Sequence, residues 1–143
     1  MALRIALGLL VVAVLAGCGA SGSGSSPASV VRAWTKAVRA DDNEAAANLF
    51  AANAEVVAPG SDQLLPTHAD AVVWNAGRVC AGRIVSLLAQ GNEVWTKFVL
   101  VNRRSSVCIA PGLRERVVLE INGGKITEFH ELTPPELEPP GAS

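Results

Sequence analysis

The alternation of apolar and polar residues divides the chain into a helical first part and an extended second part. At residues 29–40, valines, alanines and a tryptophan recur at helical spacing while basic residues lie opposite, which predicts an amphipathic helix. Asp41 and Glu44 then resemble a capping box that opens a second helix reaching Phe50. Thr67 is placed to cap a third helix. The apolar face of that helix comprises Val72, Ala76 and Val79.

Beyond Arg83 the pattern changes to short apolar runs separated by turn-forming residues, which is typical of strands. We expect antiparallel strands at residues 84–89, 94–103, 113–121 and 125–132. Asn122-Gly123-Gly124 is a strong hairpin signal because these residues tolerate positive φ, and Gln90-Gly91-Asn92 is a weaker one. A shorter extended piece at residues 55–58 stops at Pro59. Helices followed by antiparallel strands indicate an α+β fold.

The run at residues 94–103 is apolar on both faces of the expected strand. One face carries Val94, Thr96, Phe98 and Leu100, and the other carries Trp95, Val99 and Val101. Such a strand is expected inside the sheet, with one face packed on the helices. The other face then needs a cover, either a partner subunit or the side chains of neighbouring strands.

The start of the chain has the pattern of a bacterial lipoprotein signal. Arg4 precedes an apolar run of 12 residues, at 5–16, and the sequence Leu15-Ala16-Gly17-Cys18 follows the form of a lipobox. A transmembrane helix would need about 20 apolar residues, and ordinary secretory cleavage does not require the cysteine. We therefore expect residues 1–17 to be cleaved. The lipidated Cys18 would anchor the protein in the bilayer, on the extracytoplasmic face of the cell membrane.

Two segments flank the expected domain at residues 28–132. Residues 18–27 are mostly glycine and serine and are typical of a flexible tether, while residues 133–143 combine four prolines with two acids, which predicts a disordered tail. Without Arg4 the chain has 11 basic and 13 acidic residues. The basic residues are scattered along the sequence, with no basic stripe interleaved with aromatics, so we expect no nucleic-acid partner.

Two cysteines remain once Cys18 carries lipid. Outside a reducing cytoplasm, Cys80 and Cys108 are expected to form a disulfide bridge. The alternatives are two free buried thiols or half of a metal site. A structural zinc site needs four ligands, and only His68 and His130 could supplement the cysteines, at no recognisable spacing. We expect no metal and no other cofactor.

Several stretches of the domain carry a family resemblance. They are WTKAVRADD at residues 34–42, ANLFAANAEV at 47–56 followed by Pro59-Gly60, and a closing hairpin at residues 114–126. In this order and spacing they resemble the NTF2-like superfamily, the fold of ketosteroid isomerases and SnoaL-like polyketide cyclases. The resemblance spans residues 28–132. It implies an α+β cone, in which N-terminal helices pack on a curved antiparallel β-sheet around an apolar pocket open at one end.

The resemblance also allows the catalytic positions of ketosteroid isomerases to be compared with the residues of this chain. That mechanism uses a carboxylate base and two donors, a phenol and a protonated carboxylic acid. The chain has no tyrosine, and the motifs place the phenol position at Trp34, the base at Ala58 and the acid donor at or near Val117. Because Ala58 and Val117 cannot transfer a proton, we do not expect isomerisation of the ketosteroid type.

Other enzymes of this superfamily use His with Asp, or an Asp-Arg-Asp cluster. His130 and Glu128 are the candidate catalytic pair, since both lie on one face of the last strand. The alternative is a solvated pair on the outer surface, and His68, at a helix start, is expected at the surface. The ionisable residues considered for such chemistry are Glu55, Asp62, His68, Asp70, Arg114, Arg116, Glu120, Glu128 and His130.

The aromatic residues are Trp34, Phe50, Trp74, Trp95, Phe98 and Phe129. Core filling is the default role, but those that line a cavity would suit an apolar small molecule, with Trp34, Trp74 and Asn75 as orienting donors. The favoured hypothesis is a non-catalytic tethered protein that binds an apolar small molecule, an envelope protein or a second copy of itself. The second is a lyase or hydrolase acting on a lipidic or polyketide-like substrate. A purely structural spacer is the third.

Overall fold

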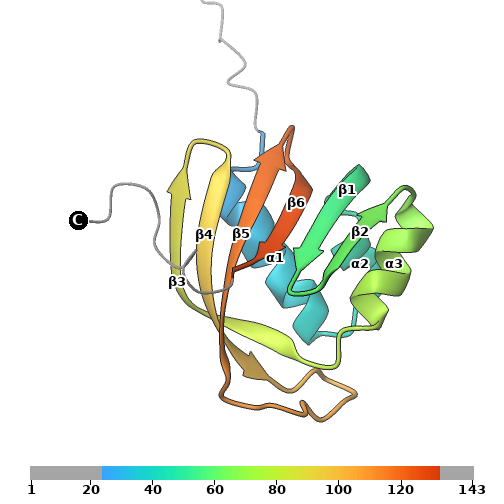
Figure 1. Ribbon diagram of the computed structural model, residues 1–143, viewed down its shortest axis with the longest axis vertical. Helices are drawn as coiled ribbons and strands as arrows, with labels where there is room; N and C mark the ends of the chain where they lie inside the picture. Colours follow the sequence, from blue (N-terminus) through green and yellow to red (C-terminus); the bar gives the residue numbers. More distant parts are fainter. Residues whose placement is uncertain (1–23, 133–143) are drawn as a thin grey trace, which may run out of the picture.

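The computed structural model describes residues 24–132. The expected signal peptide, Cys18, most of the expected tether and the proline-rich tail lie outside the described residues. In chain order the elements are α1 (Pro27–Arg39), α2 (Asn43–Ala47), β1 (Phe50–Ala58), β2 (Ser61–Leu65), α3 (His68–Ala76), β3 (Ala81–Gln90), β4 (Glu93–Val101), β5 (Arg114–Asn122) and β6 (Lys125–Glu131). Figure 1 shows α1 behind the curved sheet and α3 beside β2 at its right edge, so the expected α+β architecture is confirmed.

The sheet has six strands in the order β2-β1-β6-β5-β4-β3. Each pair of neighbours is antiparallel except β1 and β6, which run parallel. The four antiparallel strands predicted in the second half of the chain are therefore confirmed, and β4 lies inside the sheet. The sequence does not predict β2, because its residues are mostly polar and exposed and carry no alternating apolar pattern.

The second helix differs from its prediction at both ends. Its cap is Asp42, whose carboxylate accepts a hydrogen bond of 2.9 Å from the backbone N–H of Ala45, and the helix ends at Ala47. Phe50 instead begins β1 and pairs with Ile126 of β6. Pairing with the final strand thus overrides the helix propensity of the alanine run that precedes Phe50. The third helix is capped by Thr67 as predicted, but it stops at Ala76, short of Val79.

Asp41 has a structural role that its sequence position does not show. Its φ of 60° lies in the left-handed region, which aspartate tolerates better than most residues. In this conformation its carboxylate accepts a hydrogen bond of 2.7 Å from Nε of Arg103, whose side chain is only 3% exposed. Arg103 also donates to the backbone oxygens of Asn75 and Arg78, each at 2.7 Å, and at 2.6 Å to the side chain of Asn43. The α1–α2 turn, the end of α3 and the β4–β5 connection are tied together at this arginine.

The hydrophobic core lies between the helices and the inner face of the sheet. Val30, Val31 and Trp34 of α1 belong to the same buried cluster as Leu119 of β5 and Phe129 of β6. Among residues 24–132 no helix has the length and apolar character needed to cross a membrane. The buried cluster fills the space between the helices and this face of the sheet.

The outer face of the sheet carries two rows of side chains whose register runs from strand to strand. One row aligns Leu88, Trp95, Val118, His130 and Val57. The next row aligns Glu93, Glu120, Glu128 and Glu55. Side chains of neighbouring strands thus flank Trp95, the outward residue of β4 that the sequence marks as needing a cover.

Candidate functional site

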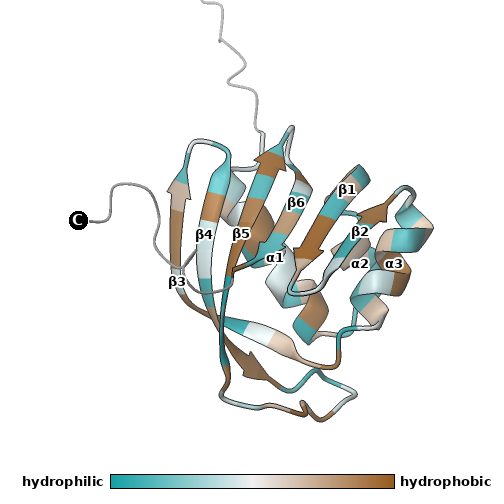
Figure 2. Cartoon of the chain, viewed as in Figure 1, coloured by the Kyte–Doolittle hydropathy of each residue, from teal (hydrophilic) through white to brown (hydrophobic). Residues whose placement is uncertain are grey.

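An apolar cavity of about 620 Å³ opens at the base of the sheet, between α3, β2 and the β4–β5 connection. Hydrophobic segments follow that connection along the lower edge of the molecule (Figure 2). The apolar lining comprises Val73, Trp74, Val79, Leu100, Ile109 and Leu113, and the polar lining includes Gln63, Arg78 and Glu115. An apolar wall with few polar groups is the usual composition of a small-molecule site.

The mouth of this cavity exposes large apolar side chains. Val73 is 72% exposed and Ile109 is 83% exposed, and Val79 and Leu113 are also largely open to solvent. We refer to Val73, Val79, Ile109 and Leu113 as the apolar rim. Single exposed apolar residues need no explanation, but a group around one opening indicates a surface that contacts a ligand or another molecule.

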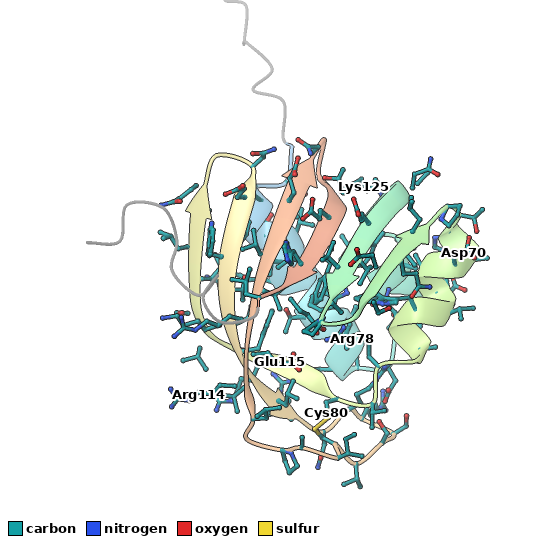
Figure 3. The ribbon with its side chains drawn as sticks, viewed as in Figure 1. Asp70, Arg78, Cys80, Arg114, Glu115 and Lys125 are labelled. Carbon is teal, nitrogen blue, oxygen red and sulfur yellow. A yellow bond between two sulfur atoms is a disulfide. The ribbon has the colours of Figure 1, made fainter. Side chains whose placement is uncertain are left out.

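A disulfide bridge holds the edge of the cavity. Cys80 and Cys108 are bonded at an S–S distance of 2.03 Å, so the predicted pairing is confirmed. Cys80 lines the cavity just before β3, and Cys108 lies in the β4–β5 connection. The bridge therefore joins two sides of the opening, near the labelled Cys80 in Figure 3.

Arg78 enters the cavity from the segment after α3 and lies against three aromatic rings. Its Cζ atom is 5.5 Å from the ring centroid of Trp34, 4.9 Å from that of Trp74 and 5.1 Å from that of Phe129. These distances are within the range of cation–π attraction. The nearest carboxylate contact is long, at 3.9 Å from Nη1 to Oε1 of Glu131. Nε of Arg78 is buried and has no hydrogen-bond partner in the described part of the chain.

Burial shifts the pKa values of the charged groups at this site. Burial lowers the pKa of the Arg78 guanidinium from its ordinary value, and the charges of Glu115 and Glu131 oppose that effect. Burial raises the pKa of the Glu115 carboxyl, which Arg78 opposes and Glu131 reinforces. Arginine stays protonated at neutral pH even so. The cavity therefore offers a permanent cation beside a carboxyl group that gains a proton more readily than an exposed glutamate.

Comparisons with known proteins identify the fold. No protein-family model and no curated protein sequence matches the chain. Among solved structures, an NTF2-like protein of unknown function from Cytophaga hutchinsonii is 12% identical with a TM-score of 0.63, over 75% of this chain and 88% of that one. A protein proposed as a polyketide cyclase from Sinorhizobium meliloti is 16% identical with a TM-score of 0.58, over 72% and 93%.

A third similar structure is a hypothetical protein of ketosteroid isomerase-like fold from Catenulispora acidiphila, in complex with trimethylamine. It is 18% identical with a TM-score of 0.57, over 73% of this chain and 84% of that one. The chain has an NTF2-like fold. At these identities the similarity establishes the fold alone, so the function must be argued from the residues of this NTF2-like cone.

The aromatic residues divide between the core and the two faces of the NTF2-like cone. Trp74 lines the cavity directly. Trp34, Phe50, Phe98 and Phe129 are buried and pack around Trp74 or one another. Trp95 lies on the outer face, where its Nε1 is 3.3 Å from Oε2 of Glu93, so it does not line the cavity.

Two of the expected orienting donors are already used within the protein. Nε1 of Trp34 donates a hydrogen bond of 2.9 Å to Oδ1 of Asn75. The amide nitrogen of Asn75 donates in turn to the backbone oxygen of Ala71 at 2.8 Å. Both side chains are buried, so neither is free to orient a ligand. Arg78 is the group that presents an unused donor at the cavity.

The catalytic candidates from the sequence lie away from the cavity. Nδ1 of His130 is 3.5 Å from Oε1 of Glu128, and the register of β6 with β1 and β5 places both on the outer face. His68 is exposed and pairs with Glu44 at 2.8 Å, which joins α3 to α2. Val117 is buried in the core. Within residues 24–132 no three His, Cys, Asp or Glu side chains gather in a way that could hold a metal ion.

The sequence does not single out the charged residues of the cavity, Arg78 and Glu115, or Glu131, which lies 3.9 Å from Arg78. Glu115 lies two positions before Val117, so both side chains face the same side of β5, but the sequence interpretation placed the acid-donor position at or near the apolar Val117 and did not consider Glu115. Arg78 follows the helix-ending Gly77 and has no motif of its own. Only the folded chain brings these residues, from the segment after α3, from β5 and from β6, together.

Proposed function

We propose that this protein is a membrane-tethered, extracytoplasmic NTF2-like lipoprotein that holds an amphipathic small molecule without transforming it. The observation that carries the proposal is Arg78, a partly buried cation whose buried Nε has no hydrogen-bond partner at an apolar cavity. A buried donor without a partner costs free energy in the empty protein, and a ligand that accepts its hydrogen bond recovers that cost.

The lining defines the chemistry of the ligand. The apolar rim suits a hydrophobic body because it is exposed around the opening, and the partly buried Trp74 extends this apolar wall into the cavity. Arg78 suits an acceptor or anionic group at the other end of the ligand, such as a carboxylate, since its fork of N–H groups matches that geometry. A lipid anchor on Cys18 would keep this opening close to a bilayer, which is a source of amphipathic molecules.

The first experiment is native mass spectrometry of the full-length protein purified from membranes in mild detergent, followed by organic extraction. We expect a defined adduct in addition to the lipid on Cys18. The variant Arg78→Met should lose the adduct, whereas Arg114→Gln should keep it, because Arg114 is exposed and does not line the cavity. An empty wild-type cavity would refute small-molecule binding. It would favour docking of an envelope protein or of a second copy on the apolar rim.

A second function is favoured by one observation, the raised pKa of Glu115 beside Arg78. A carboxyl group with a raised pKa keeps its proton to a higher pH than an ordinary glutamate and can act as a general acid, and Arg78 could stabilise negative charge on the substrate. In that case the adduct is a substrate of lyase or hydrolase type. The variant Glu115→Gln separates the two functions: it should retain the bound molecule in both cases but abolish turnover only if the protein is an enzyme.

A further inference from the structure

A second cavity, of about 720 Å³, lies between α1, the start of β3 and the loop after β4. We call it the basic groove, because no carboxylate lines it and five exposed basic side chains do. They are Arg32, Lys36, Arg39, Arg83 and Arg104. Three of the five lie four and then three residues apart on α1, so they share one helix face. Residues that the sequence scatters are thus gathered by the fold on one side of the molecule.

The charges of the basic groove are not neutralised by the protein. Within residues 24–132 none of its five exposed basic side chains takes part in a hydrogen bond or an ion pair. Arg103, at the floor of the groove, is by contrast fully occupied with Asp41 and its other partners. Like charges held together without counter-charges repel one another, and an anionic partner relieves that repulsion.

We infer that the basic groove docks on the anionic phospholipid headgroups of the membrane to which the chain is tethered. The inference rests on the proposed lipid anchor. Cys18 lies nine residues before Pro27, the start of α1, and this segment spans at most about 30 Å when fully extended. The anchor therefore keeps the groove of α1 within a few tens of ångströms of the bilayer, so that its basic residues can reach the thin zone where headgroup phosphates act on them.

Other anions fit the groove less well. Single-stranded nucleic acid needs aromatic platforms between the basic residues, and the groove lining contains no aromatic residue. A soluble phosphate compound shares the chemistry of a lipid headgroup, but nothing fixes its local concentration. Tethering gives membrane phosphates a high effective concentration at the groove, which favours the lipid surface as the occupant.

The test uses lysine labelling of the lipidated full-length chain in vesicles. The chain has three lysines, of which Lys36 lies in the basic groove while Lys97 and Lys125 do not. An amine-reactive reagent is applied to protein in vesicles of phosphatidylcholine alone and in vesicles with about one third phosphatidylglycerol. We expect labelling of Lys36, relative to Lys125, to fall about fivefold on the anionic vesicles and to recover at high salt.

A matched pair of double variants identifies the surface that docks. Replacing Arg32 and Arg39 by Gln should abolish the protection of Lys36, whereas replacing Lys97 and Arg114 by Gln removes the same charge outside the groove and should preserve it. Equal labelling of Lys36 on both vesicles would overturn the inference. So would protection by soluble inorganic phosphate on neutral vesicles, which would assign the groove to a free phosphate compound.

The same samples separate failure of the anchor from failure of docking. The intact mass shows whether Cys18 carries a diacylglyceryl lipid. A chain without lipid refutes the proposed anchoring, and the groove is then tested by flotation of that chain with the same two vesicles. Binding to anionic vesicles that the Arg32 and Arg39 double variant lacks supports docking, and equal flotation of both chains overturns it.

Discussion

Two arginines that enter the interior of the protein, the buried Arg103 and the partly buried Arg78, have opposite environments. Arg103 at the α1–α2 junction donates hydrogen bonds to Asp41, Asn43 and two backbone oxygens. Arg78 lies 25 residues earlier in the chain, and its backbone oxygen accepts one of the hydrogen bonds from Arg103. The side chain of Arg78 lies against aromatic rings, and its Nε has no hydrogen-bond partner in the described part of the chain. The comparison separates two uses of a buried charge. A fully paired arginine joins elements of the fold, whereas the arginine with an unpaired Nε is the group that we propose as the ligand contact.

The largest effect is expected at the paired arginine. Arg103→Met removes all of its hydrogen bonds, so that Asp41 keeps only its hydrogen bonds from Ser105 and the backbone oxygens of Asn75 and Arg78 lose the donor that Arg103 supplies. We expect the free energy of unfolding to fall by about 3 to 5 kcal/mol, measured by urea denaturation. Arg103→Lys retains the charge but not the planar fork of N–H groups, so its free energy of unfolding should lie between those of the wild type and Arg103→Met. A loss below about 1 kcal/mol would show that Arg103 does not join these elements.

The second-largest effect is expected at the disulfide, which joins two sides of the cavity that contains Arg78. Cys80 and Cys108 are 28 residues apart, and a bridge of that span contributes about 3 to 4 kcal/mol in the chain-entropy model. The double variant Cys80→Ser, Cys108→Ser should lose that amount in reversible denaturation. Hydrogen exchange should increase first in the β4–β5 connection near the apolar rim. Equal loosening at α1 would contradict a role confined to the cavity.

Arg78→Met should differ sharply from Arg103→Met. The substitution removes a buried cation that has few hydrogen bonds and leaves an apolar side chain among aromatic rings. Replacing a buried charge by a hydrophobic side chain of similar size is often neutral or stabilising, so the free energy of unfolding should change by less than about 1 kcal/mol or rise. Bound ligand should be lost in the same variant. A loss as large as that of Arg103→Met would make Arg78 a structural residue.

The two arginines also show how far the sequence could predict this molecule. Helical periodicity predicted α1, and apolar runs with hairpin signals predicted β3 to β6. These patterns arise locally, because the residues on the buried side of each element are apolar. The order of the motifs indicated the NTF2-like fold, and the compartment argument indicated the disulfide. Neither arginine was marked, since the partners of Arg103 and Arg78 come from elements far apart in the chain.

The errors near the site have the same physical origin. The capping-box pattern at Asp41 was ambiguous, because the neighbouring Asp42 has the same side chain and is the residue that caps α2. Asp41 instead accepts a hydrogen bond from Arg103, which lies 62 residues away in the sequence. Phe50 was assigned to a helix since the preceding alanines favour one, and its partner Ile126 lies in the last strand. Contacts with residues distant in the sequence determine both the cap of α2 and the strand position of Phe50, and local sequence patterns do not contain that information.

The smallest predicted effect is a pair of opposite pH dependences at the carboxylates beside the two arginines. Burial opposes ionisation of Asp41, but hydrogen bonds from Ser105 and Arg103 outweigh it and hold its pKa below the ordinary value of 3.8. Stability from Asp41 is therefore present above pH 3.8 and lost as the pH falls through its folded pKa. The pKa of Glu115 is raised from 4.5, so its contribution is present below pH 4.5 and lost as the pH rises through the folded value.

The two carboxylates can be separated with isosteric amides. In urea denaturation across pH 2 to 8, at steps of about half a unit, Asp41→Asn should flatten the loss of stability on the acid side, because asparagine keeps the left-handed turn without titrating. Glu115→Gln should leave that acid limb unchanged and remove the decline above pH 4.5. If both variants altered the same limb, the carboxylates would share one electrostatic environment, and the distinction between a paired junction and an open cavity would be lost.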